Sequence, residues 1–427
     1  MKTAFINGII LNGKGDMTPE EGKIIFEENG KIVSIEDASK ADTSNCKIID
    51  LKGKYILPGL INLHVHLPGS GKPSKIPLNL VLICKIITSC SLGRKIGCSM
   101  VAKSAKTALM AGITTVRSVG GIADHDALVR DDIKKGKLIG PRILPANCAI
   151  SVPGGHMAGS FAYIAHSKEE AVSLVDKIAE GNPALIKLMI TGGVLDSDEL
   201  GEPGALRMPP EYVKAVCDRA HEKGYKVAAH VEGHEGLVAA LENGVDSIEH
   251  GAKPDDKIIE LFKKNNACQV LTLTPALPYV LKLSGVMNLT EVSSANSKVV
   301  VDGMVELAKR CLEEGIMVGL GTDSSCSYAT HYDFWRELCY FVKYCGVSNK
   351  YALHTATLIN AKIAGIDDIT GSIEEGKYAD MIAVDSNPLE DLSALRNVSM
   401  VVFEGKVYDN PEVEKFEEVE KILDSMM

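Results

Sequence analysis

The feature that most constrains the fold is a regular alternation of strand-like and helix-like segments that begins near Pro58. Apolar runs predict eight strands, and each is followed by a segment with the periodicity of a helix. Eight such units are typical of an α/β protein with a closed (β/α)8 TIM barrel. An open, doubly wound sheet is the alternative, but it usually has about five to seven strands and a Gly-rich first turn, which this chain lacks. The strands are predicted at 60–66, 114–119, 142–145, 184–190, 226–230, 247–250, 269–273 and 317–323.

Both ends of the chain are rich in short strands and lack helical periodicity. Near the start, Asn29-Gly30 lies between two β-rich runs and predicts a type I′ hairpin. We expect the two ends to pair into one small β-sandwich domain. The predicted parts are the sandwich (1–57 plus 371–410), the barrel (58–370) and an acidic C-terminal helix (411–427) that docks on the protein surface or on a partner subunit.

Two further segments bear on the barrel. An apolar insert at 78–97 follows the first barrel strand and precedes a helix predicted at 102–111. It could cover the mouth of a site or form a subunit contact, and its periodicity does not choose between them. A long helix is predicted at 297–314.

Charge and cysteine content limit the partners and the compartment. The 427 residues include 46 basic and 56 acidic side chains, and this mild, dispersed excess favours neither nucleic acid nor a membrane as partner. The N-terminus lacks a basic leader with an apolar core. Eleven cysteines without CxxC pairs suit reduced thiols, so we expect a cytoplasmic protein.

The first barrel strand ends in His64-Val65-His66 and breaks into a Gly/Pro-rich run. Side chains two residues apart on a strand point to the same side, so both imidazoles can converge on one ion. Neutral imidazole is the commonest protein ligand for a transition metal. Both could equally be ordinary histidines at a strand end, and further ligands elsewhere would decide.

Further ligand-type residues lie at the ends of other predicted strands, where barrel enzymes place their chemistry. His230 ends the fifth strand, His250 the sixth and Asp323 the eighth. Singly, His250 could be a core histidine and Asp323 could cap a helix. Together with the first pair they predict a metal site.

Lys187 lies inside the apolar fourth strand, Leu185-Ile186-Lys187-Leu188-Met189. A charged lysine is costly to bury, and a lowered pKa would make its amine nucleophilic. Reaction with carbon dioxide would then give an anionic carbamate able to bridge two cations. An ion pair with a barrel neighbour is the alternative.

These residues resemble the amidohydrolase superfamily of metal-dependent hydrolases, and within it the prolidase-like (Xaa-Pro dipeptidase) and imidazolonepropionase-like enzymes. The resemblance covers nearly the whole chain. Besides the candidate ligands, it is carried by the stretches 58–66, 111–117, 191–193, 248–251 and 371–380.

The resemblance implies a role for each ligand. His64, His66 and Asp323 would hold one divalent metal, His230 and His250 the second, and carbamylated Lys187 would bridge them. Asp323 would also act as the catalytic base. Zinc is the expected metal for a histidine-rich site.

The resemblance also suggests substrate-binding residues. His156 resembles a family histidine that contacts the substrate carbonyl, and Arg117 and His331 are weaker candidates. Glu232 stands where relatives often carry tyrosine, and its charge would attract an amine or amidine. Gly233 occupies the place of the acid that deaminases usually carry.

The resulting hypothesis is a dinuclear metal hydrolase that cleaves a C–N bond in a small dipeptide-like or cyclic amide. A deaminase of a small aminoheterocycle is the first alternative, and a non-catalytic barrel scaffold is the second. We expect a small-molecule substrate and a homo-oligomer.

Overall fold

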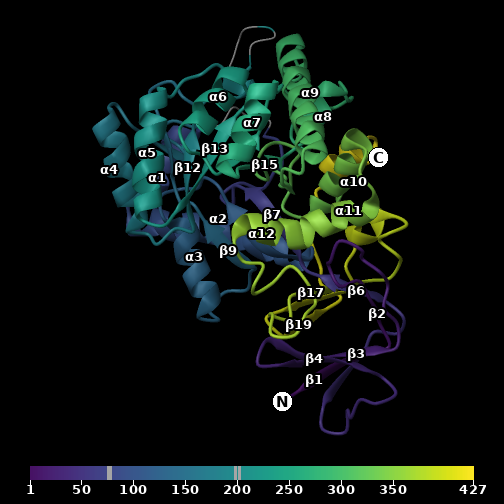
Figure 1. Cartoon of the computed structure of the whole chain (residues 1–427). Helices are drawn as coiled ribbons and strands as arrows, with labels where there is room; N and C mark the ends of the chain where they lie inside the picture. The colour runs from purple at the N-terminus through teal and green to yellow at the C-terminus, as the bar shows by residue number, and fades with distance from the viewer. Residues whose placement is uncertain (75–78, 197–199, 201–202) are drawn as a thin grey trace.

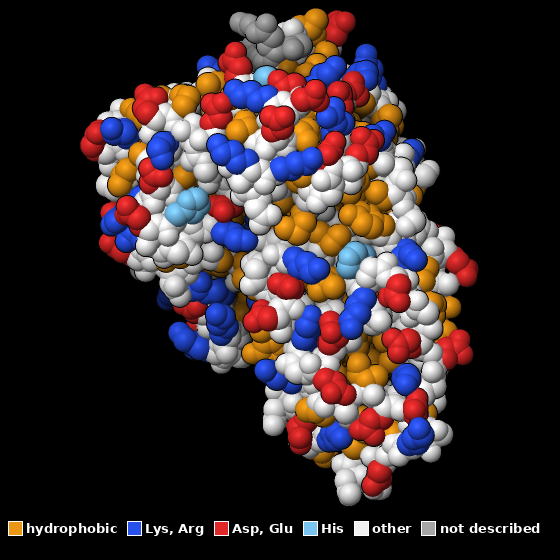
Figure 2. Space-filling model, viewed as in Figure 1, with side chains coloured by type: hydrophobic (Ala, Val, Ile, Leu, Met, Phe, Trp, Pro, Cys, Tyr) orange, Lys and Arg blue, Asp and Glu red, His pale blue; other side chains and the backbone are white. Residues whose placement is uncertain are grey.

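The computed structural model describes residues 1–74, 79–196, 200 and 203–427. Figure 1 shows helices arranged around a central sheet, with a smaller β-rich part beside it that contains the N-terminus. Figure 2 shows acidic and basic side chains interspersed over one face of the molecule, so this face carries no large area of a single charge.

The barrel strands occur where the alternation predicts them. Because these strands are buried on both faces, their sequences are almost continuously apolar. The eighth strand is shorter than predicted: it ends at Leu320, and the backbone turns at Asp323. The strands are β7 (Leu60–Val65), β8 (Ile113–Ser118), β9 (Arg142–Pro145), β12 (Leu185–Met189), β13 (Lys226–Val231), β14 (Ser247–His250), β15 (Cys268–Leu271) and β16 (Val318–Leu320).

These strands form a parallel sheet of order β7-β8-β9 and a second sheet that runs from β12 to β16 in chain order. Two short strands, β10 (Ala149–Ser151) and β11 (Ala162–Ile164), extend the second sheet beyond β12. Hydrogen bonds connect the sheets at both seams: Ala184 N donates to Pro145 O at 2.7 Å, and His66 N donates to Ser324 O at 2.9 Å. The predicted barrel fold is confirmed.

The helices follow the strands in alternation. The long helix α9 begins at Glu291, earlier than predicted, because Thr290 and Ser293 form a capping box. No helix in the described part of the chain is long and apolar enough to cross a membrane. The helices are α1 (Leu80–Ser89), α2 (Ser91–Met110), α3 (His125–Lys134), α4 (Lys168–Ala179), α5 (Pro210–Glu222), α6 (His234–Glu242), α7 (Asp256–Asn265), α8 (Leu277–Val280), α9 (Glu291–Glu313), α10 (Phe334–Cys345), α11 (Asn349–His354), α12 (Asn360–Ala364) and α13 (Glu417–Asp424).

The insert predicted at 78–97 forms a helical hairpin. Residue 78 lies outside the described residues, α1 covers half of the insert, and α2 joins its end to the helix predicted at 102–111. The sequence predicts one helix between the first two barrel strands, at 102–111, and the structure has two.

The two ends of the chain build the smaller β part. One sheet has the order β4-β3-β1-β5, and the other, β19-β18-β17-β6-β2, combines strands from both ends. Apolar side chains of both sheets form one cluster that includes Phe5, Ile25, Ile56 and Met381. The strands are β1 (Thr3–Ile6), β2 (Ile9–Ile10), β3 (Lys23–Glu28), β4 (Lys31–Asp37), β5 (Lys47–Asp50), β6 (Tyr55–Pro58), β17 (Met381–Val384), β18 (Met400–Phe403) and β19 (Lys406–Asp409).

The turn between β3 and β4 has the predicted geometry. Asn29 has φ 53° and Gly30 has φ 84°, and the strands pair antiparallel. Positive φ at both central residues is the requirement of a type I′ turn.

The C-terminal helix α13 is shorter than the predicted 411–427 and packs on this chain's own barrel helix α10. Arg336 of α10 is fully buried. Its guanidinium donates to Glu420 at 3.0 Å and to Asp424 at 2.6 Å, and it also pairs with Asp333. This buried ion cluster connects the end of the chain to the barrel.

Replacing Arg336 with methionine should destabilise the protein by about 3–5 kcal/mol, because buried carboxylates would lose their cation. The midpoint of urea unfolding measures the loss. Lys298→Ala is the matched control, since it removes an exposed pair with Asp302 that should contribute about 0–1 kcal/mol. Equal losses in both variants would contradict the structural role of the cluster.

Candidate metal centre

The structure brings the six candidate ligands to one end of the barrel, where the parallel strands finish. His64, Lys187, His230 and His250 lie on β7, β12, β13 and β14. His66 and Asp323 lie just beyond β7 and β16. The ring of His250 is 4.8 Å from that of His64 and 4.7 Å from that of His230. Strand ends of one barrel therefore place imidazoles from distant parts of the chain in contact.

The backbone is strained at two of these positions. His250 has φ 67° and Asp323 has φ 53°, in the left-handed region that residues other than glycine rarely adopt. Hydrogen bonds to a neighbouring strand hold both turns: Asp323 N donates to His64 O at 2.9 Å, and Gly251 N donates to Val231 O at 2.9 Å. Such strain is common at functional sites and indicates that the positions of these side chains matter.

Two groups of side chains have ligand atoms close enough to share an ion. His64, His250 and Asp323 form one group and His230, Glu232 and His250 the other, with all ligand atoms of each group within 4.8 Å of one another. His66 lies beside the first group, since its Nε2 is 3.2 Å from Asp323 Oδ1. Glu232, expected to contact substrate, thus also lies at the metal-binding part of the site.

The charges suit a divalent cation. Burial lowers the pKa of His230 and of His250 well below the usual value, so both imidazoles are neutral and able to bind metal. Burial alone would raise the pKa of Asp323, but His64 and His66 outweigh it and keep this carboxylate ionised.

Lys187 supports the same conclusion. Its side chain is 1% exposed, and its Nζ has no hydrogen-bond partner among the described residues. Burial lowers its pKa to about 8. Because an unpartnered buried amine is costly, a ligand or a modification of this amine would stabilise the site. These residues therefore fit divalent metal ions.

Glu249 of β14 is the principal support of the ligands. Its Oε2 accepts from His64 Nδ1 at 2.7 Å, and its Oε1 accepts from Arg117 at 2.7 Å and from Ser247 Oγ at 2.8 Å. Burial would raise the pKa of Glu249, but Arg117 and His64 lower it well below the usual value. An anion at Nδ1 leaves the Nε2 of His64 free for a metal.

Arg117 was expected to bind substrate, but its contacts are with other parts of the protein. It is buried and also donates to Leu63 O at 2.7 Å and to Ser247 Oγ at 3.2 Å. These contacts indicate support for the strand that carries His64, because the guanidinium is committed to protein acceptors.

Two other ligands are oriented in the same way. His66 Nδ1 donates to Gly120 O at 2.7 Å, and His250 Nδ1 lies 2.7 Å from Thr272 Oγ1. A hydrogen bond at one ring nitrogen fixes which nitrogen faces the metal.

The remaining candidates lie around the centre. His156 stacks on His230 with ring centroids 4.2 Å apart, and its Nδ1 lies 2.5 Å from Asp196 Oδ2. Glu232 Oε2 accepts from Val194 N at 2.9 Å. His331 is buried and donates its Nε2 hydrogen to Gly69 O at 2.7 Å, so its polar contact is with the loop after β7.

Sequence reasoning missed three residues: Glu249, Asp196 and Cys326. The Sγ of Cys326 lies 3.4 Å from Asp323 Oδ2. A charged residue inside the buried strand 247–250 was a detectable signal for Glu249. Asp196 and Cys326 lie in loops, and the sequence gives no comparable signal for them.

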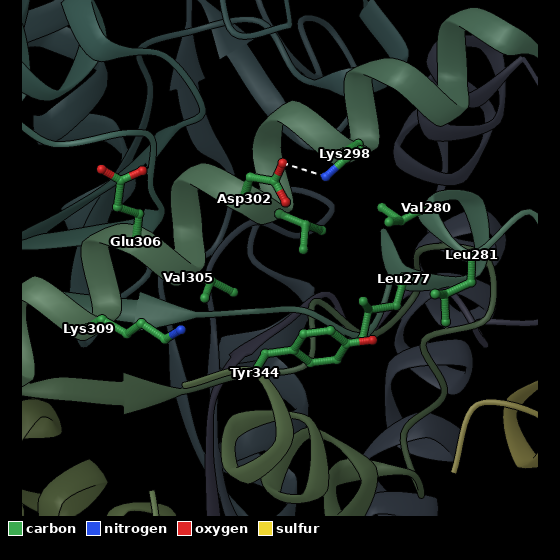
Figure 3. A pocket seen from close by; sticks show the side chains of 10 residues that line it. Leu277, Val280, Leu281, Lys298, Asp302, Val305, Glu306, Lys309 and Tyr344 are labelled. Atoms are coloured by element: carbon green, nitrogen blue, oxygen red, sulfur yellow. Dashed lines mark hydrogen bonds and ion pairs between the residues drawn. The ribbon is translucent and has the colours of Figure 1, made fainter. Parts of the chain in front are cut away.

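A groove of about 410 Å³ lies elsewhere, between α8, α9 and α10. Figure 3 shows Leu277 and Tyr344 lining it, with the Lys298–Asp302 ion pair at its edge. It contains none of the candidate ligands, so it is separate from the metal centre.

Comparison with known proteins identifies relatives over the whole fold. Residues 55–408 match the model of the amidohydrolase family. Ochratoxinase from Aspergillus niger is 25% identical over 441 aligned positions, which cover 96% of this chain and 87% of the relative.

Two solved structures are also similar. A candidate prolidase from Bifidobacterium longum has a TM-score of 0.87 and 33% identity and covers 99% of this chain and 98% of its own. A Xaa-Pro dipeptidase with bound methionine has a TM-score of 0.82 and 30% identity and covers 96% of this chain and 100% of its own.

Replacing Glu249 with glutamine should weaken metal binding by about 10–100-fold, because His64 loses its anionic partner. Metal retained after competition with a chelator, measured by mass spectrometry, gives the affinity. Glu222→Gln is the control, because Glu222 lies on the exposed surface of α5. Unchanged affinity in a folded Glu249→Gln protein would contradict the assigned role.

Proposed function

Because this chain belongs to the amidohydrolase family, we propose that it is a dinuclear metal-dependent hydrolase of a small dipeptide-like or cyclic amide. The names of its relatives support the amide bond as the target: one is a dipeptidase and another a candidate prolidase.

The observation that carries the proposal is the unpartnered, buried amine of Lys187 among imidazoles and carboxylates. As a carbamate it would bridge two cations, one held by His64, His66 and Asp323 and the other by His230 and His250. Zinc suits this mainly imidazole donor set.

Divalent cations, when bound, supply Lewis-acid activation of a water and of a substrate carbonyl. Asp323 is ionised, and its Oδ1 lies 3.4 Å from His64 Nε2 and 3.2 Å from His66 Nε2. It would accept a proton from the attacking water as the C–O bond forms. It would then give this proton to the leaving nitrogen as the C–N bond breaks, which yields a carboxylic acid and an amine.

His156 is suited to orient the substrate. Asp196 accepts from Gly193 N at 2.9 Å and engages the Nδ1 of His156, which leaves the Nε2 available for a substrate carbonyl. Asp196 is therefore a positioning residue for His156.

Glu232 narrows the substrate class. Its carboxyl lies beside His230 and His250, and burial, with a smaller contribution from Asp323, raises its pKa to about 8. At neutral pH this carboxyl is mostly protonated, but a cationic substrate amine bound beside it would favour its ionised form, which repels a substrate carboxylate. We therefore favour amides that present an amine on this side.

The second candidate, deamination of an aminoheterocycle, is favoured by the same residue. With a pKa of about 8, Glu232 is largely protonated at neutral pH and could donate a proton to departing ammonia. A non-catalytic scaffold is set aside, because the chain belongs to a hydrolase family and keeps the complete set of candidate ligands.

A cytoplasmic location is also proposed. All eleven cysteines lie within the described residues and are free thiols, which suits a reducing compartment.

Dipeptides, cyclic amides and aminoheterocycles should be assayed side by side with the zinc-loaded protein. We expect amine release from amides, and a loss of about 10²–10⁴-fold in kcat for Asp323→Asn, because proton transfer is lost. His230→Asn should lower the metal content. Full hydrolysis and metal content in both variants would contradict the proposal, whereas ammonia release from heterocycles alone would support deamination.

Recovery of activity after metal removal should depend on pH through Lys187. Only the neutral amine reacts with carbon dioxide, and with a pKa of about 8 it is mostly protonated at pH 6.5 and mostly neutral at pH 8.5. At a fixed pressure of CO₂ and saturating zinc, recovery should be roughly tenfold or more faster at the higher pH.

A carbamate signal in the ¹³C NMR spectrum of protein treated with ¹³CO₂ would report the modification directly. Lys187→Arg is the control, because it retains a positive charge but should form no carbamate. Two bound cations with unmodified Lys187 would contradict its bridging role.

A further inference from the structure

The hairpin of α1 and α2 exposes a stripe of large apolar side chains. Leu82 and Ile86 of α1 are 54% and 59% exposed, and Leu92 and Ile96 of α2 are 67% and 51% exposed. In each helix the two residues are four positions apart and share one face. The hairpin therefore has an apolar outer face, defined here by these four residues.

The opposite, inner face of the hairpin packs against other parts of the chain. Cys84 and Ile87 are buried and cluster with Ile122 and Phe161. The ring of Phe161 is 5.9 Å from that of His66. The inner face thus covers a wall of the metal centre, and within the described residues the outer face has no such cover.

The exposure is concentrated in this segment. Of the fourteen exposed large apolar residues in the described part of the chain, six lie between Leu80 and Met100. Singly scattered apolar residues are normal on a protein surface, but a contiguous apolar patch marks an interaction site.

The charge around the patch selects the partner. The hairpin carries no acidic side chain and five exposed basic ones, Lys85, Arg94, Lys95, Lys103 and Lys106, whereas the rest of the chain has 41 basic and 56 acidic side chains. The remainder of a second copy therefore offers a net negative charge to a basic, apolar hairpin. An anionic membrane would attract the hairpin too, but it would repel the acidic remainder of the molecule.

We propose that the apolar outer face of the α1–α2 hairpin docks on a second copy of this chain. A standard interface buries about 800 Å² on each partner, and the stripe would supply its apolar centre. The contact would also support the wall that the inner face forms beside His66.

Sedimentation velocity of the purified full chain at about 10 µM, with the double variant Leu92→Glu/Ile96→Glu, tests the proposal. The wild type should sediment as an assembly larger than the 45.7 kDa monomer. The variant should sediment as a monomer, with a dissociation constant raised about a hundredfold or more by the buried charges. Val299→Glu is the matched control, since Val299 is 46% exposed on α9, and it should leave the assembly intact.

A milder variant, Leu82→Ser/Ile86→Ser, keeps the test valid if the glutamates prevent folding, which circular dichroism would reveal. A monomeric wild type, or an assembly that the folded variants leave unchanged, would overturn the proposal. Sedimentation of a monomeric wild type with phosphatidylserine vesicles would overturn it in favour of a membrane surface.

Discussion

The buried ion pair between Arg117 and Glu249 is the interaction on which the geometry of the candidate metal centre depends. It joins β8 to β14, and the same guanidinium donates to the backbone of β7. Charges removed from water are tolerated only when they are paired and fully hydrogen-bonded, and Glu249 satisfies this with Arg117, Ser247 and His64. The contacts that orient the candidate metal-binding side chains therefore lie on the side opposite to the atoms that would face a metal ion.

The same principle extends outward to the smaller β part of the protein. Arg142 of β9 pairs with Asp380 at 2.7 Å and with Glu404 at 2.9 Å, and both carboxylates belong to the C-terminal segment. Asp380 O in turn accepts from Gly59 N, immediately before β7. The strand that supplies two candidate ligands is therefore anchored at its start by the β-sandwich and at its end by the barrel.

Much of this arrangement could be predicted from local sequence. Apolar strand runs and the Asn29-Gly30 turn depend on neighbouring residues, and ligand-type residues at strand ends converge in any closed barrel. The loops were not predictable, because nothing local shows that Asp196 meets His156 or that Cys326 meets Asp323. The sequence led us to expect that Arg117 binds substrate, because it does not reveal the pairing of Arg117 with Glu249, which lies 132 residues away.

The pairing of β6 with β17 has a consequence for biosynthesis. Tyr55 lies opposite Val384, so the N-terminal strands leave the ribosome long before their partner exists. At about 5–20 residues per second the delay is on the order of tens of seconds. The sheet β4-β3-β1-β5 can form from local sequence during that time, while β6 waits with an unpaired edge. The nascent chain therefore closes its first domain last, and this edge is where it would be most open to chaperones or to aggregation.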